Sequence, residues 1–182
     1  MKKLLFTLFV LFAGTLFAGC ASLPEPSGSD SIMIYGSARY QGLFVFGGNT
    51  AKAVSTVKID GIQVNIKNID DGLTFSATTN KEGELFFNDV TPGTYLVKYI
   101  GTEYRYDGKT WQLRYNVPSE VSQKFTVRSG VTNIGKIVIN LDTDSGEDYV
   151  TWAKDIEKVQ NTFKTLHPNS KWTDISWSNA NE

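Results

Sequence analysis

Short apolar segments separated by turn residues fill the chain between residues 31 and 141. Ile62, Val64 and Ile66 alternate with polar residues, which is the period of a strand with one buried face. Turn sequences such as the Pro-Gly pair at 92–93 separate the segments, and a helical period is missing from this range. The pattern therefore predicts a mainly β protein built as an antiparallel β-sandwich. The expected strands are 32–35, 43–46, 62–66, 73–77, 85–87, 95–100, 111–115, 125–127 and 137–139.

One stretch, from Thr78 to Val97, is more specific than alternation alone. Its members are Gly83, Phe86 or Phe87, Pro92, Gly93, Tyr95 and Val97, with Gly61-Ile62-Gln63-Val64 before it and a closing strand pair at 129–137. This pattern resembles the carboxypeptidase regulatory-like domain. The resemblance implies a seven-stranded sandwich of transthyretin-like (prealbumin-like) type over residues 32–142. It also implies an accessory or binding module without catalytic residues of its own.

The resemblance carries two structural expectations. Tyr95 and Val97 should face the core from the strand that follows Pro92-Gly93. The connection from 37 to 60 is longer than in that family and contains the apolar run 43–46. It predicts either an additional strand at the sheet edge or an exposed apolar loop.

The N-terminus reads as an export signal. Met1-Lys2-Lys3 is followed by an uncharged apolar run of 15 residues, 4–18, which is shorter than the roughly 20 residues of a membrane-spanning helix. Ala18, Gly19 and Cys20 resemble the lipobox of bacterial lipoprotein signal peptides. That resemblance implies a signal peptide at 1–19 and a palmitate-type acyl anchor with diacylglycerol on Cys20. An ordinary signal peptide with an incidental cysteine is the alternative.

Several expectations follow from this N-terminus. Residues 20–31 predict a lipidated cysteine and a flexible tether, because 21–31 is rich in Pro, Gly and Ser. By the same resemblance, Ala21 in place of Asp implies that the protein is anchored in the outer membrane and faces the periplasm or the cell surface.

Cys20 is the only cysteine, so disulfides are excluded. Without Lys2 and Lys3 the chain has 16 basic and 19 acidic side chains and no basic run, so nucleic acid is not an expected partner.

The C-terminal region, 143–182, changes period. Spacings of three and four predict an amphipathic helix that Ser145 caps, with Glu147 and Asp148 in its first turn and Pro168 at its end. An aromatic tail with Trp172, Ile175 and Trp177 follows it. The helix is expected to lie on its own sandwich, and docking on a partner is the alternative; the repeat is too short for a coiled coil. The apolar stripe consists of Tyr149, Trp152, Ile156, Val159, Phe163 and Leu166.

Few residues in the sequence are candidates for catalysis, metal binding or ligand contact. His167 is the only histidine, and it is expected to be exposed rather than catalytic. The acidic segments 70–72 and 142–148 are interpreted as a turn and a helix start rather than metal sites. We expect no metal and no cofactor. Four aromatic residues crowd one hairpin, where they either pack in the core or form a ligand or partner contact: Tyr104, Tyr106, Trp111 and Tyr115.

These observations predict a lipid-anchored cell-envelope protein that is not an enzyme. It is expected to act as a non-catalytic binding or structural module, mainly through contacts with an envelope protein. The alternative is a carbohydrate-binding surface module that uses the hairpin 104–115 to contact a glycan. A hydrolase is a third hypothesis, which requires a cleft with clustered carboxylates around Asp70 or Asp142.

Overall fold

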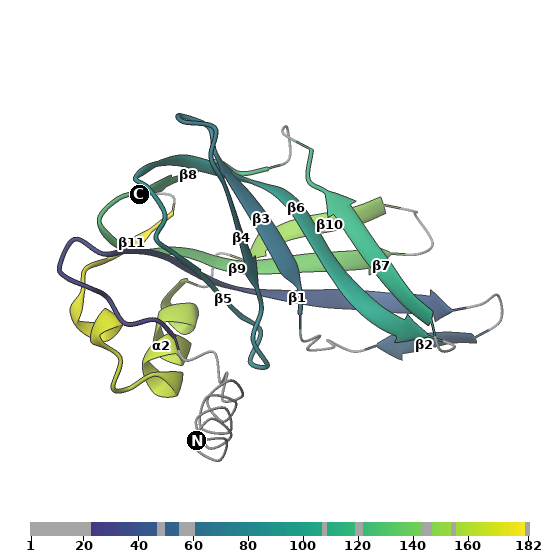
Figure 1. The fold of residues 1–182 in the computed structure, drawn as a ribbon. Coiled ribbons are helices and arrows are strands. Elements are labelled where there is room, and N and C mark those ends of the chain that lie inside the picture. Colours follow the sequence, from purple (N-terminus) through teal and green to yellow (C-terminus); the bar gives the residue numbers. More distant parts are fainter. Residues whose placement is uncertain are drawn as a thin grey trace, which may run out of the picture.

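The computed structural model describes residues 23–46, 50–54, 61–106, 109–118, 122–142, 147–153 and 156–180. Strands dominate this part of the chain, in two sheets that face each other with one α-helix beside them (Figure 1). The mainly β prediction is therefore confirmed. The described residues form eleven strands, not the seven expected from the family resemblance.

The first sheet has the order β10-β9-β1-β2, with β5 also on β1 and β11 also on β9. Its long central strands β1 and β9 run parallel, and β11 is parallel to β9, so the antiparallel prediction does not hold for these pairs. On the edge that faces away from β9, β1 pairs with β2 and β5. On the edge that faces away from β1, β9 pairs with β10 and β11. The elements are β1 (Ile32–Phe46), β2 (Thr50–Val54), β5 (Glu84–Asn88), β9 (Gly130–Asp142), β10 (Glu147–Ala153) and β11 (Trp177–Asn179).

The second sheet is antiparallel, with the order β4-β3-β6-β7 and β8 beside β6. A tight turn joins β3 and β4, and its Gly72 has a φ of +81°, a conformation that glycine adopts without a steric cost. The elements are β3 (Gln63–Asn68), β4 (Thr74–Thr78), β6 (Gly93–Tyr106), β7 (Lys109–Asn116) and β8 (Phe125–Val127).

The main core lies between the two sheets. Ile62, Val64 and Ile66 are fully buried in it, as their alternation predicts. Tyr95 and Val97 are also fully buried, so the expected orientation of that strand is confirmed. The Tyr95 hydroxyl donates to the carbonyl oxygen of Thr91 at 2.6 Å, which satisfies the one polar group that this ring brings inside.

The long connection after Gly36 forms strands rather than a loop where the structure describes it. Residues 37–46 continue β1, and β2 pairs antiparallel with the end of β1, Gly42↔Val54 to Phe46↔Thr50. Of the two alternatives for this segment, the additional edge strand is the one observed. The expected closing pair at 129–137 is instead one continuous strand, β9.

The C-terminal helix α2 (Ile156–Leu166) is shorter than predicted. Tyr149 and Trp152 belong to β10, which pairs with β9 from Glu147↔Asp142 to Ala153↔Lys136. The predicted helix start at Ser145 is therefore wrong. Tyr, Val, Thr and Trp crowd this segment and favour strands, and the edge of β9 next to residues 136–142 offers it hydrogen bonds. Leu166 is the last helical residue, two positions before Pro168, as predicted.

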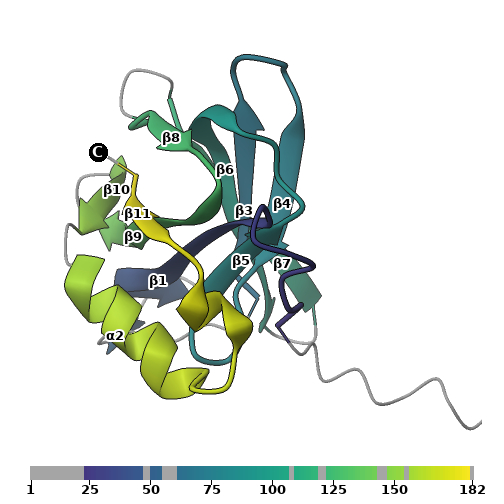
Figure 2. The same ribbon diagram turned by 90° about the vertical axis from the view of Figure 1, so that its left-hand side faces the viewer.

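Helix α2 lies against the outer face of the first sheet, on the side away from β3 and β4 (Figure 2). Val159 and Phe163 are buried there, while Leu166 is 42% exposed. The helix therefore packs on its own sandwich, as expected. We call α2, the 3₁₀ turn Lys171–Asp174 and β11 together the C-terminal cap.

Candidate functional site

The structure describes only some of the site residues that the sequence predicts. Cys20 lies outside the described residues. Tyr104 and Trp111 are register partners in the β6–β7 hairpin, but their side chains and that of Tyr106 lie outside the described part. Tyr115 is half-buried and packs against the core between the sheets. The predicted contact through this hairpin thus stays a prediction.

The C-terminal cap covers an aromatic cluster on the first sheet. Phe163 of α2 is fully buried, with its ring centroid 4.9 Å from Tyr35 of β1 and 5.0 Å from Trp177 of β11, at steep interplanar angles that such pairs prefer. Phe86 and Trp172 complete the cluster, together with Met33 and Val131 from the central strands. This second core fixes the helix on the sheet.

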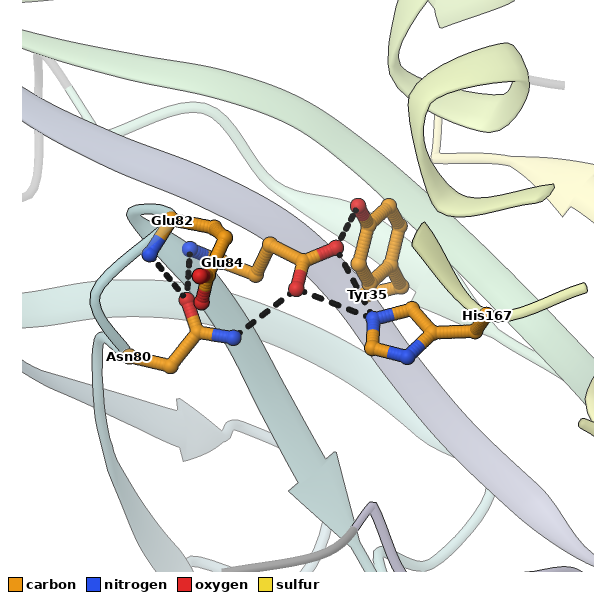
Figure 3. A network of polar contacts seen from close by, with 5 residues as sticks. All are labelled: Tyr35, Asn80, Glu82, Glu84 and His167. Atoms are coloured by element: carbon orange, nitrogen blue, oxygen red, sulfur yellow. Dashed lines mark hydrogen bonds and ion pairs between the residues drawn. The ribbon is translucent and has the colours of Figure 1, made fainter. Parts of the chain in front are cut away.

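A buried carboxyl group lies at the edge of this cluster. Glu84 opens β5 with a side chain only 3% exposed, and three side chains converge on it (Figure 3). The Tyr35 hydroxyl donates to one carboxyl oxygen at 2.8 Å, and the Asn80 amide donates to the other at 2.8 Å. The Nε2 atom of His167 lies 3.0 Å from that second oxygen. His167 is thus not the simply exposed residue that the sequence predicts.

The turn before β5 prepares this position. Asn80 accepts backbone N–H bonds from Glu82 and Glu84 through its side-chain oxygen, at 3.1 and 2.8 Å. Gly83 has a φ of +82°, which suits glycine. Burial, and then the adjacent Glu84 carboxyl group, raises the pKa of Tyr35 far above its ordinary value. These contacts occupy both carboxyl oxygens, so we interpret the network as the link between the sheet and the end of α2.

The segment before β1 also contacts the cap. The indole N–H of Trp172 donates to the carbonyl oxygen of Pro24 at 2.7 Å, and the backbone N–H of Lys171 donates to Glu25 at 2.8 Å. Leu23 packs against the aromatic cluster. We call Leu23, Pro24 and Glu25 the N-terminal clasp. The expectation of a free tether therefore does not hold at Leu23, Pro24 and Glu25.

The outer face of the second sheet is different, because no described element covers it (Figure 1). Two rows of paired residues cross it. One row runs Thr78–Gln63–Gly101–Arg114 over β4, β3, β6 and β7, and the next runs Ser76–Asn65–Tyr99–Asn116. Gly101 leaves a gap in the first row, so backbone forms the floor there. A hollow of about 400 Å³ lies at this gap, which we call the sheet groove. Its lining is Gly61, Gln63, Thr78, Tyr99, Gly101, Thr102, Gln112 and Arg114.

The acidic segments show no metal centre where they are described. Asp70 accepts from the backbone N–H of Thr94 at 2.7 Å, and Asp71 accepts from that of Leu73 at 2.8 Å, so both carboxylates hold turns, as interpreted from the sequence. The described residues contain no group of three acidic, histidine or cysteine side chains that could hold a metal ion. Within the same ranges, no helix is long and apolar enough to cross a membrane. Residues 143–146 lie outside the described part.

Comparison with models of known protein families and with curated proteins finds no match for this chain. Sequence reasoning missed Glu84, the N-terminal clasp and the sheet groove. Glu84 gave one signal, an acidic residue directly before the apolar run Leu85–Phe87, but nothing local indicated that its partner would be His167, 83 positions away.

Proposed function

We propose that the protein is a lipid-anchored module of a bacterial cell envelope that works by non-covalent contacts and not by catalysis. The observation that carries the proposal is the position of Cys20, the only cysteine, directly behind an export-like apolar segment. In this proposal Cys20 bears the lipid, and two or more acyl chains give it a stable membrane anchor. The outer membrane is the proposed location.

The N-terminal clasp adds an orientation to this proposal. Only Ala21 and Ser22 separate Cys20 from Leu23, the first residue seen against the cap. Three peptide steps reach about 10 Å at most. A lipid on Cys20 would therefore hold the C-terminal cap close to the membrane surface. The outer face of the second sheet, on the opposite side of the sandwich, would remain open to a partner.

The family resemblance enters as part of the same proposal. Gly83, Pro92-Gly93, Tyr95 and Val97 occupy turns and core positions, as a carboxypeptidase regulatory-like domain of transthyretin-like type requires. Two facing sheets support a sandwich of this kind. In this interpretation the cap and the further strands beyond seven are additions to the sandwich of that family, and the chain serves as an accessory or structural module through contacts with an envelope protein.

The anchor is tested by replacing Cys20 with Ser in a bacterium with two membranes. The parent chain should incorporate an alkyne-labelled palmitate and stay with membranes after carbonate washing, because its acyl chains are buried in the bilayer. The Cys20→Ser variant should lose the label and leave the membrane fraction. Ser22→Ala, two residues away, is the matched control and should keep both properties. A Cys20→Ser variant that resists carbonate would contradict the anchor and indicate that residues 4–18 are retained in the membrane.

A further inference from the structure

We propose that the sheet groove on the outer face of the second sheet binds a saccharide that carries a carboxylate group. Gln112 and Arg114 of the groove belong to the hairpin 104–115, but the groove lies over the middle of the sheet and does not include the four aromatic residues singled out in that hairpin. The inference does not depend on the lipid anchor. Its volume of about 400 Å³ lies at the lower end of the range of ligand pockets, roughly 300–1,000 Å³, and suits a small sugar.

The hydrogen-bonding capacity of the groove favours a hydroxyl-rich ligand. Gln63, Thr78 and Tyr99 line it, and their side chains make no hydrogen bond to any other residue in the described chain. An amide and two hydroxyl groups supply both donors and acceptors, as the ring hydroxyls of a sugar require. The lining contains no aliphatic side chain, so an apolar ligand would gain little there.

Tyr99 adds a face for the sugar ring. Its side chain is half-buried at the centre of the second row, beside the gap that Gly101 leaves in the first row. An aromatic ring held in this way presents apolar area next to a polar hydroxyl, which suits a ring with C–H groups on one face and hydroxyls at its rim. The bare backbone at Gly101 lets the ligand approach the sheet closely.

Arg114 selects a ligand with a carboxylate. Its guanidinium group donates to the side-chain oxygen of Gln112 at 2.7 Å, which orients its planar fork. Arg114 is the one charged residue among those that line the groove, so it has no carboxylate partner within the lining. Guanidinium groups bind carboxylates through two parallel hydrogen bonds. The chain has a net charge of −1, so non-specific attraction of anions does not account for such binding.

Titration calorimetry on the purified full-length protein tests the inference. The probes are three acidic saccharides, namely trigalacturonic acid, sialyllactose and N-acetylmuramic acid, each paired with its methyl ester, which keeps the ring and removes the charge. We expect at least one acid to bind about tenfold or more tightly than its ester, since a hydrogen bond to a charged group has that effect.

Variants locate the binding. Arg114→Gln should weaken binding of the acid about tenfold and abolish the preference over the ester, and Tyr99→Ala should weaken acid and ester alike. Arg128→Gln, an exposed arginine between β8 and β9 that does not line the groove, is the matched control and should bind as the parent does. All variants should melt close to the parent. Failure of all three acids to bind, or equal binding by parent and Arg114→Gln, would overturn the proposal.

Discussion

The two sheets of the sandwich differ in what lies on their outer faces. The first sheet is covered by the C-terminal cap, whereas the outer face of the second sheet has no described element over it. The covered strand β1 has Met33, Ile34 and Tyr35 in succession, all buried, because both of its faces are packed. The uncovered strand β3 alternates exposed Gln63 with buried Val64. A continuous apolar run therefore marks a strand covered on both sides, and alternation marks one with a solvated face.

Deleting the C-terminal cap should have the largest effect on stability, because it uncovers the outer face of the first sheet. A chain without residues 156–182 loses the burial of Val159, Phe163 and Trp172, and each large apolar side chain contributes roughly 1.5–3 kcal/mol. The total of roughly 5–9 kcal/mol is comparable with the whole stability of an ordinary domain. We expect aggregation, or a melting transition lowered by tens of degrees, in calorimetry and light scattering. A truncated chain that is monomeric and melts like the parent would show that the cap is dispensable.

A single substitution on each face gives the next largest difference. Phe163→Ala removes a fully buried ring from the covered face and should cost about 3–5 kcal/mol in urea unfolding. Tyr99→Ala on the uncovered face should cost less than about 1 kcal/mol, because most surface substitutions have small effects. Equal losses of stability from the two variants would mean that the second sheet is also covered, for example by another molecule.

The carboxyl group of Glu84 allows a sharper test of the covered face. Glu84→Ala leaves the Tyr35 hydroxyl and the Asn80 amide without their buried acceptor and should cost about 3 kcal/mol. Glu82→Ala is the matched control, since that side chain is exposed in the same turn; its effect should stay within about 0.5 kcal/mol. His167→Ala should fall between the two. If Glu84→Ala unfolded like Glu82→Ala, the network would not hold the cap.

The features predicted correctly from the sequence are those with a local cause. The alternation of Ile62, Val64 and Ile66 is enough to place their side chains inside, because side-chain direction alternates along a strand. The same alternation places Tyr95 and Val97 on one face of their strand, and the family resemblance indicated that this face is the inner one. Each of these inferences uses residues within a few positions of one another.

The errors came from segments whose conformation depends on distant partners. Tyr149 and Trp152 fit a helical spacing, yet the edge of β9 takes them into a strand. Residues 23–25 have the composition of a tether, yet Trp172 and Lys171, almost 150 positions later, hold them. Of the predicted aromatic contact residues, the described side chain of Tyr115 packs on the core, and the sheet groove owes its shape to Gly101. Periodicity contains no information on such long-range pairs.

The smallest expected effect concerns the pH dependence of the covered face. Burial and the neighbouring Glu84 raise the pKa of Tyr35 above its ordinary value of about 10. Above pH 10 the unfolded chain therefore loses this proton while the folded chain keeps it, and stability falls as the pH rises, by at most about 1.4 kcal/mol per pH unit from this group. Below pH 10 both states are protonated, and Tyr35 contributes no pH dependence.

Tyr35→Phe isolates this contribution. The variant should lose about 1 kcal/mol at pH 8, because one hydrogen bond to Glu84 is removed. Between pH 10 and 11 its stability should decline less steeply than that of the parent, since the phenylalanine has no proton to lose. Urea unfolding at pH 8, 10 and 11 measures both differences. Parallel declines in parent and variant would mean that the Tyr35 hydroxyl reaches solvent, and that the cap does not seal the outer face of the first sheet at this point.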